Sequence, residues 1–307
     1  MASRPTLFIQ HPRCLQHDMG PDHPESADRL RAIEKHIKQS QWGNALLFKE
    51  APKIERDWLS RIHPKNHIKA LMERSPTSGF TELDADTRLN PHSIDAALYA
   101  VGAAIDATDE VIAGHAKNAF CAVRPPGHHA ESAIAMGFCL FNSVALAAER
   151  ALSKGMKRVA ILDFDVHHGN GTVEIFQDRP EVLVCSSFQH PFYPGRFDTV
   201  QLPNICLTPL PAGTNGPEYH AAIETQWTKA LLAHQPEMIF ISAGFDAHKD
   251  DPLGGLNLED HDYLHLTQFI QDLAMQTAEG RIVSLLEGGY HLDALGRSVV
   301  KHIQGLI

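Results

Sequence analysis

The chain has 307 residues, of which 43% are hydrophobic and 21% charged, and its formal net charge is −10 at pH 7. A chain of this length buries about three quarters of the surface that it exposes when unfolded, so it needs no disulfide staples to fold. The negative charge opposes broad affinity for nucleic acids, and no run approaches the roughly 18 apolar residues of a membrane span. We therefore expect a globular protein that binds neither nucleic acid nor membrane.

Cysteine usage and the start of the chain bear on the compartment. Five cysteines lie at positions 14, 121, 139, 185 and 206, an odd number without C-x-x-C pairing. This pattern predicts reduced, mostly buried thiols. The first eleven residues contain no apolar segment typical of a secretory signal. Together these features predict a cytoplasmic protein, and they give no indication of its oligomeric state.

The N-terminal third combines two regular elements with a region of turns. A strand is predicted at residues 6–10 and a helix at 26–39, with Ser26 as its N-cap. Residues 49–92 alternate short helical pieces with turns and are predicted to form a loop-rich insertion. An Ala-rich helix follows at 93–114 and ends at a glycine, the usual stop signal.

The rest of the chain alternates short apolar strands with helices. The predicted strands are 119–123, 158–163, 182–186, 238–242 and 282–286, and the predicted helices lie near 141–154, 217–234, 260–278 and 292–304. This alternation is typical of a mostly parallel sheet with helices on both faces. Because we find no repeat, low-complexity tract or linker, we expect one α/β domain over residues 1–307.

The densest group of reactive side chains lies at residues 162–172, directly after a predicted strand. Alternate residues of an extended chain point to the same side, so Asp163, Asp165 and His167 converge. Three such groups at one edge repel one another, or stay unsatisfied in a core, unless a cation binds them. The segment therefore predicts a divalent metal site, although helix caps or solvated loop residues could give the same pattern.

Three further predicted strands also run into loops that carry Gly beside His, Asp or Tyr. These loops are residues 125–129, 242–248 and 287–290. Ligands of open parallel sheets bind at the carboxyl ends of the strands, where loops carry the chemistry. Four such loops together outline one active site.

These segments resemble, in order along the chain, the motifs of the zinc-dependent histone deacetylase family, which also includes acetylpolyamine amidohydrolases and acetoin-utilisation proteins. The matching segments are 23–29, 124–129, 136–139, 163–171, 191–195, 242–248 and 287–290, and residues 165–172 are closest to class II and bacterial members. The resemblance implies the arginase/deacetylase fold. It also implies a linear-amide hydrolase (EC 3.5.1 type) that uses metal-activated water to remove acetyl or other acyl groups from acyl-lysine side chains.

The resemblance places the catalytic zinc on Asp165, His167 and Asp246. One imidazole and two carboxylates leave room for water and a substrate oxygen, as a catalytic site requires. The same oxygen-rich set also suits Fe²⁺ or Co²⁺. Family members bind a structural potassium ion as well, and the resemblance implies that it lies at Asp163, Ser186 and Ser187.

For catalysis, the resemblance implies that His129 is the general base and later the acid that protonates the leaving amine, while His128 tunes the site electrostatically. Each imidazole needs an acceptor that fixes its tautomer, and the resemblance supplies Asp163 and Asn170 respectively. Asn170 stands where some members have Asp, so His129 should be less strongly held in its cationic form. Tyr290 would donate its hydroxyl to the oxyanion, a contact typically worth ~10²–10³ in rate.

Two aromatic residues, Phe138 and Tyr193, resemble the paired walls of the narrow acyl-lysine tunnel of the family. Tyr replaces the more usual Phe in the second position and adds a hydroxyl to the wall. The carbonyl of Gly137 would accept the substrate amide N–H. Ordinary core packing is the alternative for either aromatic side chain.

Residues at the rim of the site bear on the substrate. Asp84 is the expected rim aspartate that holds the substrate backbone, and Asp86 competes for this role. Leu253 is apolar in a segment where one polyamine-selective branch has an acidic gatekeeper. This favours an acyl-lysine peptide or protein, or a small acylated amine, over a polyamine.

Three other hypotheses remain. An acetylpolyamine amidohydrolase would keep the chemistry and change the substrate. A binuclear ureohydrolase of the arginase type would need further bridging ligands, and Asn170 and Tyr290 argue against it. A non-catalytic zinc module that binds acylated lysine predicts loss of Tyr290 or His129, and both are present.

Overall fold

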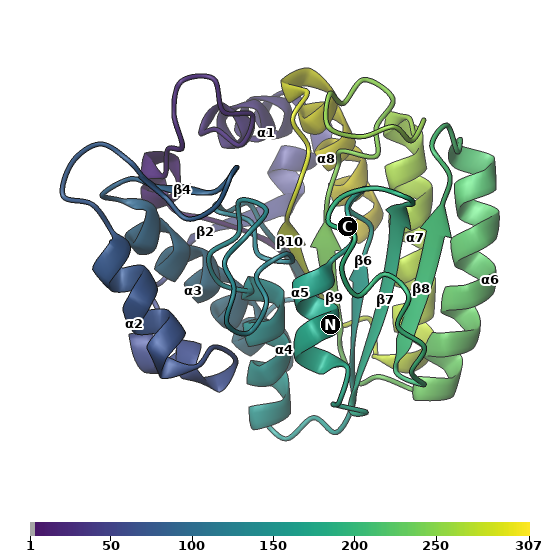
Figure 1. Cartoon of the computed structure of the whole chain (residues 1–307). Helices are drawn as coiled ribbons and strands as arrows, with labels where there is room; N and C mark the ends of the chain where they lie inside the picture. The colour runs from purple at the N-terminus through teal and green to yellow at the C-terminus, as the bar shows by residue number, and fades with distance from the viewer. Residues whose placement is uncertain (1–3) are drawn as a thin grey trace.

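The computed structural model describes residues 4–307 and contains an eight-stranded sheet in which all neighbouring strands run parallel (Figure 1). The strand order is β2-β1-β5-β10-β9-β6-β7-β8. The strands are β1 (Thr6–Gln10), β2 (Leu46–Glu50), β5 (Asn118–Cys121), β6 (Val159–Asp163), β7 (Val182–Gln189), β8 (Ile205–Leu210), β9 (Ile239–Ala243) and β10 (Ile282–Leu286).

Helices cover both faces of the sheet (Figure 1). One layer consists of α1 (Asp28–Gln39), α8 (Leu292–Leu306), α7 (Asp260–Thr277) and α6 (Gly216–His234). The other consists of α3 (Ser93–Ile112), α4 (Ser143–Ser153) and α5 (Asn170–Phe176), with α2 (Lys65–Arg74) outside it. The predicted fold class, a parallel sheet between two helical layers, is confirmed.

The central strands read as continuous apolar runs because both of their faces are covered. Every residue of β6, β9 and β10 is buried. Such runs are typical of parallel sheets, which bury both faces beneath crossover helices. This burial places the ends of these strands, and the polar loops that follow them, in a low-dielectric environment.

The two edge strands were not predicted. In β2, Leu47 and Phe48 are exposed, so the segment lacks the buried run of a central strand. In β8, Pro209 argues against a strand, yet a proline is tolerated at an edge because the outer side needs no N–H donor. The predicted loop-rich region also contains a short antiparallel hairpin of β3 (Thr81–Glu82) and β4 (Arg88–Leu89).

Two predictions about helices were wrong. Ala27, not Ser26, occupies the N-cap of α1 and makes no side-chain hydrogen bond, while the Ser26 carbonyl accepts the Arg29 N–H. Helix α5 was missed because it begins at Asn170, inside the segment that was interpreted as a polar metal loop.

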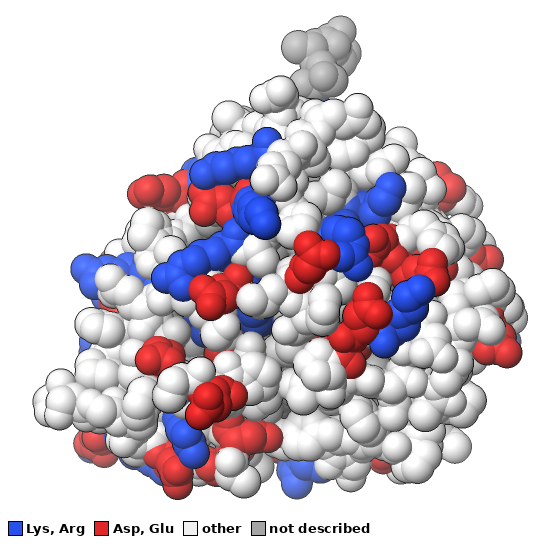
Figure 2. All heavy atoms as spheres, turned by 90° about the horizontal axis from the view of Figure 1, so that it is seen from above, with Lys and Arg blue, Asp and Glu red and all other residues white. Residues whose placement is uncertain are grey.

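The cysteines, the helices and the surface charges of residues 4–307 bear on the expectations from composition. All five cysteines are free and four of them are buried, as predicted. Within this range no helix combines the length and apolarity that crossing a bilayer requires. Viewed from above, acidic and basic side chains are interspersed over the surface (Figure 2). The predicted absence of a signal rests partly on residues 1–3, which lie outside the described residues.

Candidate active site

Four adjacent strands, β5, β10, β9 and β6, end at one edge of the sheet and deliver the predicted site residues. Asp163 is the last residue of β6, Asp246 follows β9, and Tyr290 follows β10. His128 and His129 lie in the loop that follows β5. The structure thus brings together the four polar loops that the sequence placed after separate strands.

The residues predicted to bind zinc form a compact buried cluster. His167 Nδ1 lies 3.0 Å from Asp165 Oδ1 and 3.2 Å from Asp246 Oδ2, and one donor atom from each residue lies within 4.8 Å of the others. Backbone N–H groups hold the remaining oxygens: Gly288 donates to Asp165 (2.7 Å) and Val166 donates to Asp246 (2.9 Å).

Asp246 carries the strongest sign that this cluster is built for a cation. Its Oδ2 is buried and accepts no well-aligned hydrogen bond, although His167 Nδ1 lies 3.2 Å away. Burial, and then the charge of Asp165, raise the pKa of Asp246 to about 7. A divalent ion would supply the missing partner and offset the repulsion between the two carboxylates. One imidazole and two carboxylates therefore fit a catalytic metal.

Two glycines give these carboxylates the space that they occupy. A Cβ added at Gly288 would lie 2.0 Å from Asp246 Oδ2, and one added at Gly244 would lie 2.2 Å from Asp165 Oδ2. Any larger residue at either position would displace a predicted metal ligand.

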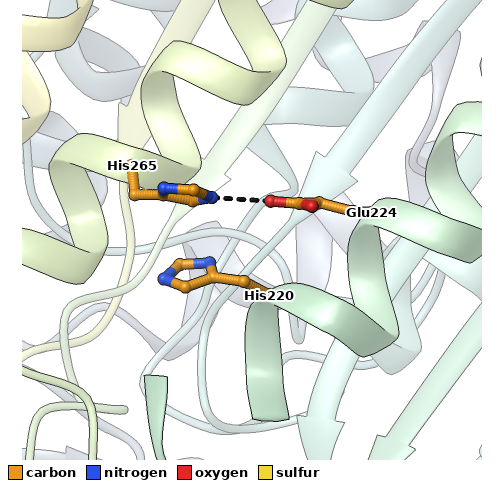
Figure 3. A group of neighbouring side chains, drawn as sticks. All are labelled: His220, Glu224 and His265. Carbon is orange, nitrogen blue, oxygen red and sulfur yellow. Dashed lines mark hydrogen bonds and ion pairs between the residues drawn. The ribbon is translucent and has the colours of Figure 1, made fainter. Parts of the chain in front are cut away.

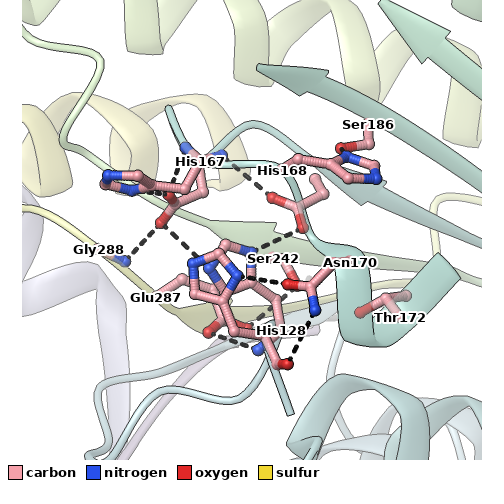
Figure 4. Close-up of polar contacts among 12 residues, drawn as sticks. His128, His167, His168, Asn170, Thr172, Ser186, Ser242, Glu287 and Gly288 are labelled. Carbon is pink, nitrogen blue, oxygen red and sulfur yellow. Dashed lines mark hydrogen bonds and ion pairs between the residues drawn. The ribbon is translucent and has the colours of Figure 1, made fainter. Parts of the chain in front are cut away.

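The tandem histidines use the predicted partners. His128 Nδ1 lies 2.9 Å from Asp163 Oδ2, and His129 Nδ1 lies 2.8 Å from Asn170 Oδ1. His128 and Asn170 are labelled in Figure 4. Burial, and then the charges of His128 and His167, hold the pKa of His129 well below its usual value. His129 is therefore neutral at neutral pH and can accept a proton.

Two residues that the sequence analysis missed fix the orientation of Asn170. Its Nδ2 donates to Glu131 Oε1 at 2.8 Å, and Arg196 holds the Glu131 carboxylate with two bonds of 2.6 and 2.8 Å. An ionised carboxylate only accepts, so the amide oxygen of Asn170 must face His129. This puts the proton on Nδ1 of His129 and leaves Nε2 as the free base.

Glu287 was quoted in the family motif without a role, and the structure gives it one. Its Oε2 accepts the backbone N–H groups of Gly127 (2.7 Å) and His128 (3.2 Å), and its Oε1 accepts the Ser242 hydroxyl (3.1 Å). The loop after β10 thereby holds the histidine loop in place, as Figure 4 shows for the labelled residues.

A cavity of about 420 Å³ opens above these groups. Its lining includes most of the predicted substrate-binding residues together with several that were not predicted: Asp86, His129, Gly137, Phe138, His167, Gln189, Phe192, Tyr193, Pro252, Leu253, Gly254, Gly255 and Tyr290. Asp84 has a different position. Its Oδ1 accepts the N–H groups of Asp86 (3.0 Å) and Thr87 (2.7 Å), so it shapes the loop from which Asp86 reaches the cavity.

The predicted aromatic walls lie against the side chains predicted to be catalytic. The ring of Phe138 lies edge-on to Tyr290 with centroids 5.9 Å apart, and Tyr193 lies edge-on to His129 at 5.2 Å. Gly137 has a positive φ of 56°, and a Cβ there would lie 2.5 Å from His129 Cδ2. Only glycine allows the backbone to pass this close to the imidazole.

Tyr290 is held from two sides. Asp251 Oδ2 accepts its N–H at 2.6 Å, and Asp251 Oδ1 accepts the N–H of Leu253 at 3.0 Å, which links Tyr290 to the rim. The guanidinium of Arg29 lies 4.9 Å from the Tyr290 ring centre. Burial raises the pKa of Tyr290 well above its usual value, so its hydroxyl stays protonated and can donate.

The residues predicted for potassium lie side by side on β6 and β7. Asp163 pairs in register with Ser186, and the Ser187 hydroxyl donates to the Asp163 carbonyl at 3.3 Å. The Ser186 hydroxyl contacts His168 Nδ1 at 3.0 Å. The three residues are therefore direct neighbours in the sheet.

Comparisons with known proteins agree with this geometry. Residues 23–306 match the family model described as "Histone deacetylase domain". The chain is 32% identical to a "histone deacetylase-like amidohydrolase" of Pseudomonas aeruginosa over 99% of this chain and 87% of that protein. It is 36% identical to the "polyamine deacetylase HDAC10" of Mus musculus over 92% of this chain, but spans only 45% of that protein. The crystal structure of the HDA15 HD domain superposes with a TM-score of 0.91 at 34% identity, covering 98% of this chain and 89% of that one.

Proposed function

This chain belongs to the histone deacetylase family and is a metal-dependent deacetylase of acylated amines, and we propose that it acts on acylated lysine side chains. The observation that carries the proposal is the cavity itself. It is lined by the aromatic rings of Phe138 and Tyr193 and by the apolar Leu253, together with His129 and Tyr290. A long aliphatic stem that ends in an amide matches such a passage.

We propose that Asp165, His167 and Asp246 hold the catalytic cation, with zinc the expected metal and Fe²⁺ or Co²⁺ the alternatives. When bound, the cation supplies Lewis-acid polarisation of the acyl carbonyl and lowers the pKa of water. A structural potassium ion would be held near the strand-end residues Asp163, Ser186 and Ser187, where it would compensate the clustered carboxylates.

The side chains of this protein divide the proton transfers between them. His129 is neutral and its Nε2 is free, so it takes a proton from the attacking water and returns it to the leaving amine. Tyr290 donates its hydroxyl to the oxygen that becomes negative in the transition state. His128 is held by Asp163, and its positive charge favours the neutral form of His129.

The substrate is positioned by the cavity walls. Phe138 and Tyr193 enclose the aliphatic stem, and the carbonyl of Gly137 accepts the amide N–H. Asp86 lines the cavity, and Asp84 fixes the loop that carries it, so Asp86 is the better placed of the two to hold a substrate backbone. We propose that residues 1–307 act as one catalytic domain in the cytoplasm.

The test is turnover of a fluorogenic acetyl-lysine peptide by the zinc-loaded protein, with Tyr290→Phe alongside. We expect turnover by the wild type and a loss of ~10²–10³ in kcat for the variant. Absence of wild-type turnover despite a bound metal would contradict the acetyl-lysine assignment, and panels of longer acyl groups and acetylated polyamines would then identify the substrate.

A polyamine substrate is the second candidate. It is favoured by one observation, because the carboxylate of Asp86 in the cavity wall could attract a second ammonium group of the substrate. The apolar Leu253 opposes it. A kcat/KM for N-acetylated diamines above that for acetyl-lysine peptides, reduced by Asp86→Asn, would favour this candidate.

A further inference from the structure

A second group of metal-ligand side chains lies on the helical layer, away from the cavity. His220 and Glu224 lie one turn apart on α6, and His265 faces them from α7 (Figure 3). We call these three residues the helical cluster. The two helices approach closely here, since a Cβ added at Gly216 would lie 2.1 Å from Asp262 Oδ1.

The donor atoms of the helical cluster converge. One atom from each residue lies within 4.8 Å of the other two. His265 Nε2 lies 2.6 Å from Glu224 Oε1, and the rings of His220 and His265 lie with their centroids 4.1 Å apart (Figure 3). Two imidazoles so close to one carboxylate form a donor set and not merely a surface ion pair.

His220 carries the independent evidence. Its residue surface is only 9% exposed, and its Nδ1 is buried with no hydrogen-bond partner. Its other nitrogen, Nε2, lies 2.9 Å from Asp262 Oδ1. Because an ionised carboxylate only accepts, the proton lies on Nε2 and Nδ1 presents a lone pair.

Asp262 is itself held in place. Its Oδ2 accepts the backbone N–H of Glu259 at 2.7 Å in the capping box of α7. A carboxylate that fixes the tautomer of an imidazole while the opposite nitrogen stays free is the usual arrangement behind a metal-bound histidine. A lone pair buried without a donor is otherwise costly.

We propose that His220, Glu224 and His265 bind a divalent cation of the zinc class, with water completing its coordination. Two imidazoles and one carboxylate are a donor set that Zn²⁺ favours and that Ni²⁺ or Cu²⁺ also accepts. None of the three residues lines the catalytic cavity, so this site is separate from the catalytic metal. The ion joins α6 to α7 across residues 41 apart in sequence, and it therefore stabilises the folded chain, because the unfolded chain lacks the site.

The test is zinc stoichiometry of the intact enzyme. Protein already loaded at the catalytic site is dialysed against micromolar Zn²⁺, and bound metal is measured in the wild type, His265→Ala and Glu224→Gln. We expect two ions per chain in the wild type and one in each variant. Zinc should also raise the melting temperature of the loaded wild type and should not raise that of the variants.

His115→Ala is the matched control. His115 Nδ1 lies 2.9 Å from Glu110 in an exposed ion pair that belongs to no three-donor cluster among residues 4–307. Its loss should leave two ions per chain. One ion in the wild type, or two in both cluster variants, would overturn the proposal. Circular dichroism of each variant separates a lost site from a lost fold.

Discussion

The proposed catalytic metal ligands Asp165, His167 and Asp246, which we call the catalytic cluster, and the helical cluster both combine carboxylates with imidazoles, but in different surroundings. Asp165, His167 and Asp246 come from loops at strand ends, and two of the carboxylate oxygens are held by backbone N–H groups. In the helical cluster the side chains of His265 and Glu224 are 55% and 40% exposed. The carboxylates of the first cluster are therefore held by the backbone, whereas in the helical cluster only His220 is held, by Asp262, and Glu224 and His265 keep rotamer freedom.

This difference predicts where each cluster is sensitive. The geometry of the catalytic cluster depends on the backbone and on glycines. A substitution at a residue that is not itself a metal ligand can therefore abolish this geometry. The helical cluster depends on single side chains, and its ion should be weaker and easier to remove.

Replacing Gly288 with alanine should have the largest effect. The new Cβ would lie 2.0 Å from Asp246 Oδ2 and 2.6 Å from Asp165 Oδ2, so both carboxylates must move. We expect loss of the catalytic metal and of turnover, measured by metal analysis and by peptide deacetylation. Retained metal with normal turnover would show that the backbone of this loop moves to accommodate the methyl group. That outcome would contradict a rigidly held cluster.

Tyr290→Phe should cost ~10²–10³ in kcat while the catalytic metal stays bound, because only the donor to the oxyanion is lost. The measurement is kcat and KM with the acetyl-lysine peptide, together with metal content. An equal loss of metal would assign Tyr290 to the metal site and contradict its role as a hydrogen-bond donor.

Asn170→Asp should move the acidic limb of the pH–rate profile to higher pH. A carboxylate beside His129 favours the imidazolium and raises the pKa of His129, and the protonated base is inactive. Turnover at low pH should therefore fall, while turnover at alkaline pH changes less. Because the new carboxylate also faces Glu131, Glu131→Gln in the same background should restore stability without reversing the pH shift. An unshifted limb would exclude His129 as the titrating base.

Glu131→Gln alone should have a smaller effect, of about tenfold in kcat, at the low end of the ~10–100-fold losses typical of supporting hydrogen bonds. A neutral amide can donate as well as accept, so Asn170 is no longer forced to face His129 with its oxygen. Arg196→Ala, which leaves the Glu131 carboxylate in place, should cost less still. Equal losses in the two variants would argue against amide orientation as the cause.

Removal of zinc from the helical cluster should have the smallest effect on turnover and a measurable one on stability. A site with 100-fold excess ligand over its Kd stabilises by about 2.7 kcal/mol. Mild chelation that leaves the catalytic ion in place should lower the melting temperature of the wild type and leave that of His265→Ala unchanged. A melting temperature insensitive to chelation would remove the structural role of this ion.

The sequence predicted the centre of the sheet better than its edges. Central strands such as β6 and β9 are buried on both faces and show unbroken apolar runs. Edge strand β2 exposes Leu47 and Phe48, and β8 contains Pro209, so neither carries that signal. The order of the strands, which places four loops side by side, follows from packing that no local pattern encodes.

The candidate site divides in the same way. Asp165 and His167 converge as predicted, but Asp163 does not join them: β6 ends at Asp163, so the alternation of an extended chain stops there, and the third member of the cluster is Asp246 from the loop after β9. Glu131 and Asp251 are single charged residues whose partners come from distant segments, and nothing in their neighbours indicates those contacts. The helical cluster could be predicted from the sequence only in part. The spacing of His220 and Glu224 fits one helix face, but His265 comes from another helix.

Arg29 contacts the loop that carries Tyr290, which is synthesised much later than Arg29 itself. It donates to the carbonyls of Glu287 and Gly289, in the segment that directly precedes Tyr290, and it also pairs with Glu25. These carbonyls lie 258 and 260 residues after Arg29 in the sequence, so on the ribosome Arg29 is made long before its partners. A chain that stops before β10 lacks both Tyr290, the proposed donor to the oxyanion, and Glu287, which holds the loop of His128. We therefore expect the site to be complete only once β10 is inserted between β5 and β9.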